Sequence, residues 1–140
     1  MSILGLGITS SNQLYNLAKK LNLKINYIGF AENLPKKIIN GIYIINLGDN
    51  YRFGTHWTLL YIKDNEAFYS DSYAMPPEDY IFDFVKGKNF EYNKDFQLQG
   101  IDENYCGVWV IASAYYLKNE KGSLKERFNK FTKHFNNLKV

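Results

Sequence analysis

The sequence predicts an α+β fold, in which a small, mainly antiparallel sheet packs against a central buried helix and flanking helices. Three observations predict it. Short runs rich in β-branched and aromatic residues occupy the middle of the chain. The stretch 107–117 is apolar almost all round, which is typical of a buried helix. Amphipathic patterns near both ends of the chain favour two helices that flank this core.

The first half of the chain is expected to form a helix and a three-stranded meander. Ser10 and Gln13 fit a capping box, so the helix should begin near Ser10 or Ser11, with its apolar residues on one face. The charged tetrapeptide KDNE supplies a hairpin turn between the second and third strands. The three strands are expected at NGIYIINL (40–47), HWTLLYI (56–62) and AFYSDSY (67–73).

The second half is expected to be mainly helical. The stretch MPPEDYIFDFV predicts a turn and then a helix with Pro77 at its first position. A weaker strand is expected at either FEYN (90–93) or FQLQ (96–99). Ser123 and Glu126 form a second capping box after the buried helix and begin a final helix. The apolar stripe of this helix comprises Leu124, Phe128, Phe131, Phe135 and Leu138.

Size and composition narrow the class of protein. The 140 residues contain no repeat, low-complexity tract or linker, so we expect a single domain over 1–140. No apolar stretch is long enough to cross a bilayer, and the first thirty residues lack the pattern of a signal peptide. We therefore expect a protein that is not secreted and has no transmembrane segment. The net charge of +3 permits an acidic partner without requiring one.

Cys106 is the only cysteine, and it stands where the polar residues 102–104 lead into the buried helix. A lone cysteine beside an apolar helix is most often packing material. At a helix N-terminus, however, the macrodipole and the unpaired N–H groups favour a reactive thiolate, and Gly107 would let a substrate approach closely. Both interpretations stay open for this residue alone. A single cysteine excludes an intramolecular disulfide and a cysteine-based zinc site.

His56 and Asp71 are candidate partners for a thiolate. A histidine can hold the charge of a thiolate and later protonate a leaving group at neutral pH. His56 precedes one predicted strand and Asp71 ends the next, and a tight hairpin brings these two ends together. Each residue has a plainer alternative, a hydrogen-bonded strand histidine and a strand-ending aspartate. His134 lies in a lysine-rich helix and is assigned no chemistry, and two distant histidines make a poor metal site.

A glutamine upstream of Cys106 is a candidate for stabilising an oxyanion. Gln99 lies seven residues before Cys106, and its amide could donate a hydrogen bond together with the Cys106 backbone N–H. Gln97 is a competitor, because alternation along a strand would place it on the same face. The order His, Asp, Gln, Cys is the strongest signal in the sequence.

Four stretches carry a likeness to a known family that runs over nearly the whole chain: LAKKLNLKINYIGFAENLP (17–35), GTHW (54–57), YSDSYAMPP (69–77) and LQGIDENYCG (98–107). In these stretches the sequence resembles the adenain-like cysteine proteases, the family of the adenovirus maturation protease, and more broadly the clan shared with SUMO- and ubiquitin-like-specific proteases. Within this family it resembles the compact type of virophages and large DNA viruses. The resemblance implies that Trp57 and Gly107 border the substrate cleft. It also implies His56, Asp71 and Cys106 as catalytic residues and Gln99 as the oxyanion-hole residue, with QG at 99–100 favouring Gln99 over Gln97.

The resemblance implies a viral endopeptidase that processes capsid and virion precursor proteins at glycine-containing sites, in the virion and in the host cytoplasm or virus factory. No cofactor is implied, and a disulfide-linked peptide activator is not expected because no second cysteine exists. DNA is a candidate partner through a basic C-terminal helix, Lys118–Lys139, although a solvated face is the plainer interpretation of that segment. The chain is expected to be a monomer. The family's cleavage pattern also matches ILGLG, which makes self-cleavage between Leu6 and Gly7 a further expectation.

Two other functions stay open at this point. A deconjugating protease that acts on ubiquitin-like Gly-Gly tails would use the same chemistry, but it needs a large docking surface for which this chain has little room. An inactive relative could serve as a binding or capsid-associated module, although the complete set of four predicted site residues argues against it.

Overall fold

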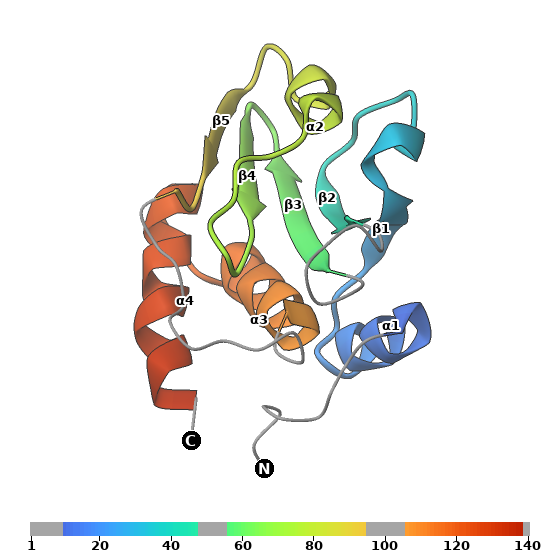
Figure 1. Ribbon diagram of the computed structural model, residues 1–140. Coiled ribbons are helices and arrows are strands. Elements are labelled where there is room, and N and C mark those ends of the chain that lie inside the picture. Colours follow the sequence, from blue (N-terminus) through green and yellow to red (C-terminus); the bar gives the residue numbers. More distant parts are fainter. Residues whose placement is uncertain (1–9, 48–55, 95–105, 139–140) are drawn as a thin grey trace.

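The computed structural model describes the backbone of residues 10–47, 56–94 and 106–138, with side chains up to residue 135. A five-stranded sheet lies between two layers of helices (Figure 1), which confirms the α+β class. The elements are, in order, α1 (Ser11–Lys20), β1 (Ile25–Phe30), the 3-10 turn η1 (Ala31–Asn33), β2 (Gly41–Asn46), β3 (Trp57–Lys63), β4 (Glu66–Ser70), α2 (Asp79–Phe84), β5 (Asn89–Tyr92), α3 (Cys106–Asn119) and α4 (Leu124–Leu138).

The strands follow one another across the sheet in the order β1-β2-β3-β4-β5. Strands β2, β3 and β4 form the expected antiparallel meander. The outer strands β1 and β5 pair in parallel with their neighbours, so the sheet is mixed rather than mainly antiparallel. Strand β5 covers most of the FEYN stretch, whereas β1 was not predicted as a strand. The alternative FQLQ stretch lies outside the described residues.

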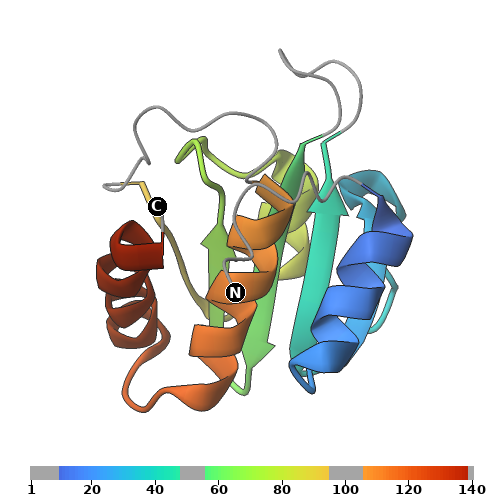
Figure 2. The same ribbon diagram turned by 90° about the horizontal axis from the view of Figure 1, so that it is seen from below.

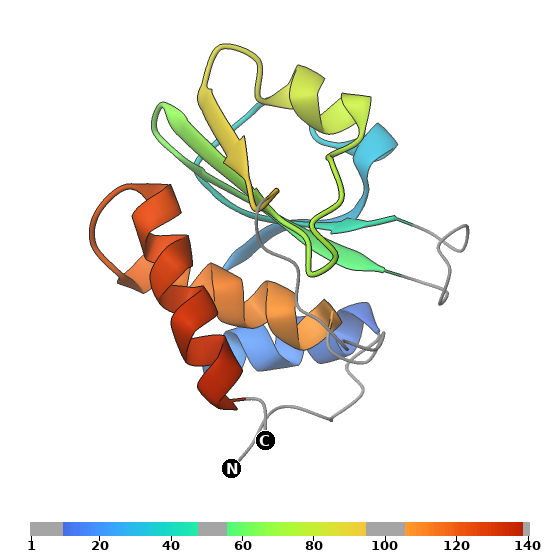
Figure 3. The ribbon, with the colours of Figure 1, turned by 60° about the vertical axis from the view of Figure 1, so that its left-hand side comes forward.

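Both faces of the sheet are covered. Helices α1, α3 and α4 lie on one face, and α2 with η1 lies on the other (Figure 3). Alternation along β3 sends Leu59 and Tyr61 toward α3 and sends Leu60 and Ile62 toward α2. Strand β3 therefore buries nearly every side chain, which explains why its sequence is apolar without a polar face.

The predicted helix starts are confirmed with one exception. Ser10 caps α1 in a capping box with Gln13, and Ser123 and Glu126 exchange the two hydrogen bonds of a second box at the start of α4. The exception is Pro77, which was expected at the first position of α2. That prediction is wrong because Glu78 still has an extended backbone, with ψ of 158°, so the helix begins at Asp79.

Helix α3 crosses the middle of the sheet between α1 and α4 (Figure 2). Its residues from Cys106 to Ala114 are all buried, as its uninterrupted apolar sequence predicts. Trp109 is fully buried and packs edge-on against three rings of α4, with centroid distances of 4.8 to 5.9 Å. These rings are Phe128, Phe131 and Phe135. The contact surface between α3 and α4 is thus largely aromatic, which supplies much apolar area in a short chain.

The segment Lys118–Lys139 is not one helix, which corrects the expectation of a single basic C-terminal helix. Lys118 belongs to α3, and a turn separates it from α4. Lys118 donates to the backbone oxygen of Asn22 at 2.7 Å, and Arg127 is buried with its guanidinium bonded to Gly122 O and Leu117 O. Lys130 donates to Lys121 O at 3.3 Å and lies 3.6 Å from Glu120, so three basic groups in the described part of this segment are used within the fold. None of the helices in the described part of the chain is both long and apolar enough to span a membrane.

We predict that Arg127→Ala lowers the free energy of unfolding by about 1–3 kcal/mol. The substitution removes the donor of two backbone oxygens, that of Leu117 in the last turn of α3 and that of Gly122 in the turn that follows. Urea unfolding monitored by circular dichroism would measure the loss. Lys133→Ala, which removes an exposed side chain from the same helix, is the control and should change stability by no more than about 0.5 kcal/mol. Equal effects of the two substitutions would contradict the structural role of Arg127.

Candidate active site

Three of the predicted site residues come together at one end of the sheet. His56 immediately precedes β3, Asp71 immediately follows β4, and Cys106 is the first residue of α3. Because β3 and β4 are antiparallel and Leu59 pairs with Ser70, the start of one strand lies beside the end of the other. Packing of α3 across β3 then brings the N-terminus of the helix to the same end, where His56 hydrogen bonds with both Asp71 and Cys106.

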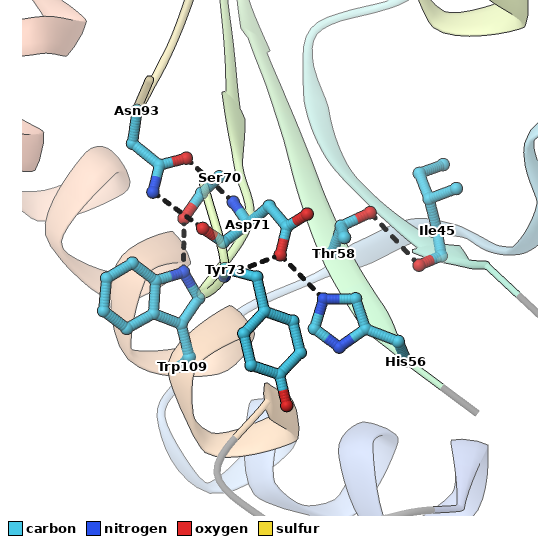
Figure 4. A network of polar contacts seen from close by, with 8 residues as sticks. All are labelled: Ile45, His56, Thr58, Ser70, Asp71, Tyr73, Asn93 and Trp109. Carbon is cyan, nitrogen blue, oxygen red and sulfur yellow. Dashed lines mark hydrogen bonds and ion pairs between the residues drawn. The ribbon is translucent and has the colours of Figure 1, made fainter. Parts of the chain in front are cut away.

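The contact between His56 and Asp71 defines the protonation of the imidazole. The Nε2 atom of His56 lies 2.7 Å from Oδ1 of Asp71 (Figure 4), and both side chains are buried. A carboxylate can only accept a hydrogen bond, so Nε2 carries the proton and donates it. Nδ1 is then the ring nitrogen left to exchange a proton with the thiol of Cys106. This is the arrangement that a histidine base needs.

Burial disfavours a charged imidazole and lowers the pKa of His56, but the hydrogen bonds to Asp71 and Cys106 and the negative charges of these two groups outweigh burial. The net effect raises the pKa of His56 from 6.5 to about 9. The imidazole is therefore protonated at neutral pH. A protonated imidazole beside a sulfur at a helix N-terminus stabilises a thiolate, which is the nucleophilic form of cysteine.

Tyr73 covers one face of the imidazole. Its ring stacks on His56 with the centroids 4.7 Å apart and the planes inclined by 29°. Its backbone N–H donates to Oδ1 of Asp71 at 2.9 Å, the same oxygen that accepts from His56. The electron-rich face of a tyrosine attracts a cation, so the stacking favours the imidazolium. Tyr73 thus contacts both partners of the His56–Asp71 pair.

Hydrogen bonds also fix the backbone of Asp71 in place. The side-chain amide of Asn93 accepts from Asp71 N at 2.9 Å and donates to Asp71 O at 2.7 Å. One residue earlier, Ser70 Oγ accepts a hydrogen bond of 2.7 Å from the indole N–H of Trp109 in α3 (Figure 4). Asp71 therefore stands in a network that joins β4, the end of β5 and the core of α3.

The sequence pattern did not reveal three members of this network. Asn93 lies 22 residues from Asp71, and Trp109 lies 39 residues from Ser70, so no local signal connects the partners of either bond. Tyr73 did have a signal, because an aspartate that accepts from the backbone N–H two residues later is a common turn pattern.

The remaining predicted site residues are placed as follows. Trp57 is only 5% exposed and belongs to the core beside α3, and its place in a cleft wall stays a prediction. Gly107 is buried in the first turn of α3. Gln99 and its competitor Gln97 lie outside the described residues, as does the Leu6–Gly7 bond. His134 lies elsewhere, where its Nδ1 is 2.7 Å from the hydroxyl of Tyr116.

Comparison with known proteins adds no assignment: no protein-family model matches the chain, and no curated protein matches it.

The raised pKa of His56 predicts a pH-dependent stability. Because the folded protein binds this proton more tightly than the unfolded chain, the stabilisation is fully present below pH 6.5 and is lost as the pH rises through about 9. Its size is on the order of 3 kcal/mol. Urea unfolding of the wild type and of His56→Gln at pH 6 and pH 9.5 would measure it. We expect the difference in stability between the two proteins to shrink at the higher pH, and an equal difference at both pH values would contradict the prediction.

Proposed function

We propose that this protein is a cysteine endopeptidase that cleaves virion precursor proteins at glycine-containing sites. The observation that supports this most directly is that one histidine hydrogen bonds both with a buried carboxylate and with the single thiol of the chain. A structural cysteine does not need a charged partner, whereas a nucleophilic one does. The viral substrates and the glycine preference come from the resemblance to adenain-like proteases.

In the proposed acylation step, the Cys106 thiolate attacks the carbonyl carbon of the scissile bond, and a C–S bond forms as the carbonyl oxygen becomes an oxyanion. The Cys106 backbone N–H and the amide of Gln99 donate to this oxyanion. The C–N bond then breaks, and the His56 imidazolium gives its proton to the leaving amine. Asp71 keeps the ring oriented and its Nε2 protonated throughout.

In the proposed deacylation step, the neutral imidazole of His56 takes a proton from a water molecule. The resulting hydroxide attacks the acyl carbon and the C–S bond breaks, which releases the acid product and restores the thiolate and imidazolium. A pKa of about 9 for His56 is consistent with this cycle, since the resting enzyme then holds the proton that the first step consumes.

The same chemistry would serve a deconjugating protease, so the two activities differ only in the substrate. The endopeptidase remains our proposal because the sequence resembles the adenain-like maturation proteases more directly than the deconjugating proteases of the same clan. DNA stays a proposed partner. Within the described parts of the segment 118–139, Lys118, Arg127 and Lys130 bond to the backbone of the fold, so contacts with DNA would fall to three other exposed lysines, Lys121, Lys125 and Lys133.

We predict that Cys106→Ser reduces cleavage of a fluorogenic peptide with a Gly-Gly site by at least about a thousandfold, because a serine hydroxyl beside an imidazolium is not ionised. Turnover would be measured with and without duplex DNA, and in parallel with a ubiquitin-like Gly-Gly conjugate. Unfolding of both proteins in urea controls for stability. Full activity in the serine variant would exclude Cys106 as the nucleophile, and cleavage of the conjugate alone would favour the deconjugating protease.

The two glutamines before Cys106 give a matched pair of variants. We predict that Gln99→Ala lowers kcat by about 10²–10³-fold, the usual effect of losing one oxyanion donor, with little change in KM. Gln97→Ala should stay within about twofold of the wild type. Steady-state kinetics of both variants on the same peptide would measure the two values of kcat. A larger loss of kcat in Gln97→Ala than in Gln99→Ala would assign the oxyanion role to Gln97 instead.

A further inference from the structure

The side chain of Asn93 continues the sheet where its backbone pairing ends. Strands β4 and β5 are parallel, and their last paired residues are Tyr69 and Tyr92. Just beyond this pair, the amide of Asn93 accepts from the N–H of Asp71 and donates to its C=O. A carboxamide has the same donor and acceptor as a peptide group, so it replaces the backbone partner that the ladder no longer supplies.

This replacement matters because Asp71 is fully buried. A buried backbone N–H without a partner is costly, and the N–H of Asp71 is paired with Asn93. The C=O of Asp71 has a second donor in the N–H of Ala74, at 2.8 Å. Asn93 is itself 5% exposed, which keeps water from competing for these bonds. An alanine could form neither bond, and a serine hydroxyl could replace only one.

We propose that Asn93 is a positioning residue for the His56–Asp71 pair: it fixes the backbone of Asp71 so that Oδ1 stays in line with Nε2 of His56. This inference rests on the proposed function for its kinetic consequence, but its effect on His56 is independent of any activity. Asn93 acts from the end of β5, so a strand that contributes no reacting group helps to set the geometry of the site.

The direct test is titration of His56 by NMR in protein with isotopically labelled histidine. In Asn93→Ala we expect the pKa of His56 to fall by at least about one unit, because a misplaced carboxylate stabilises the imidazolium less. Asn93→Ser replaces the carboxamide by a hydroxyl that can accept from Asp71 N, so the pKa of His56 in this variant should lie between its values in the alanine variant and in the wild type. This second variant is also less prone to unfold.

Ser113→Ala is the matched control. Ser113 is fully buried in α3, seven residues after Cys106, and its hydroxyl donates to a backbone oxygen, that of Val110. It should lower stability without moving the pKa of His56. The proposal is overturned if both Asn93 variants keep the wild-type pKa of His56, or if Ser113→Ala shifts that pKa equally. It is also overturned if neither Asn93 variant folds, because Asn93 would then have a purely structural role.

Kinetics then tests whether Asn93 acts through Asp71. We expect Asn93→Ala to lower kcat/KM by at least about tenfold and to move the alkaline limb of its pH profile to lower pH. In an Asp71→Ala background the same substitution should change kcat/KM by less than about twofold, because the group that it positions is gone. A similar loss in both backgrounds would refute the proposal. A shifted pKa without any Cys106-dependent turnover would instead refute the proposed function alone.

Discussion

The burial of α3 on every side from Cys106 to Ala114 is the constraint on which the rest of the structure depends. This part of the helix must be covered by β3 on one side and by α1 and α4 on the others, since it has no polar face to turn toward water. Trp109 anchors the arrangement through the aromatic rings of α4 and through its hydrogen bond to Ser70. Once α3 lies across β3, its first residue, Cys106, must lie at the end of the sheet where β3 begins.

The site is built around a buried pair of charges. Burying an imidazolium and a carboxylate is costly unless both find good partners. Oδ1 of Asp71 accepts from His56 and from the Tyr73 N–H, while the stacked ring of Tyr73 favours the cation. These contacts offset the cost of burial and hold the imidazolium beside the sulfur. A thiol, an imidazole and a carboxylate are therefore brought together in the described parts of the chain.

Much of the fold follows from local patterns, and the differences have identifiable causes. The capping boxes and the apolar central strands were predictable because each depends on residues that are close in sequence. Strand β1 was missed because it is a half-buried edge strand that contains Asn26 and Gly29, two residue types that are uncommon in strands. Its parallel pairing, like that of β5, is decided by partners far along the chain. Arg127 looked like part of a basic surface and instead closes the turn between α3 and α4.

The sequence by itself determined which residues could carry chemistry: one thiol, a histidine before a strand, and an aspartate at the end of the paired strand. Their types and order could be read because hairpin pairing and helix burial are encoded locally, by alternation and by the lack of a polar face. Only the tertiary structure decided that Nε2 of His56 faces Asp71, that the pKa of His56 rises to about 9, and that Asn93 holds the backbone of Asp71. The physical reason is that these properties depend on distances of about 3 Å between groups on different elements, and local sequence patterns do not specify such distances.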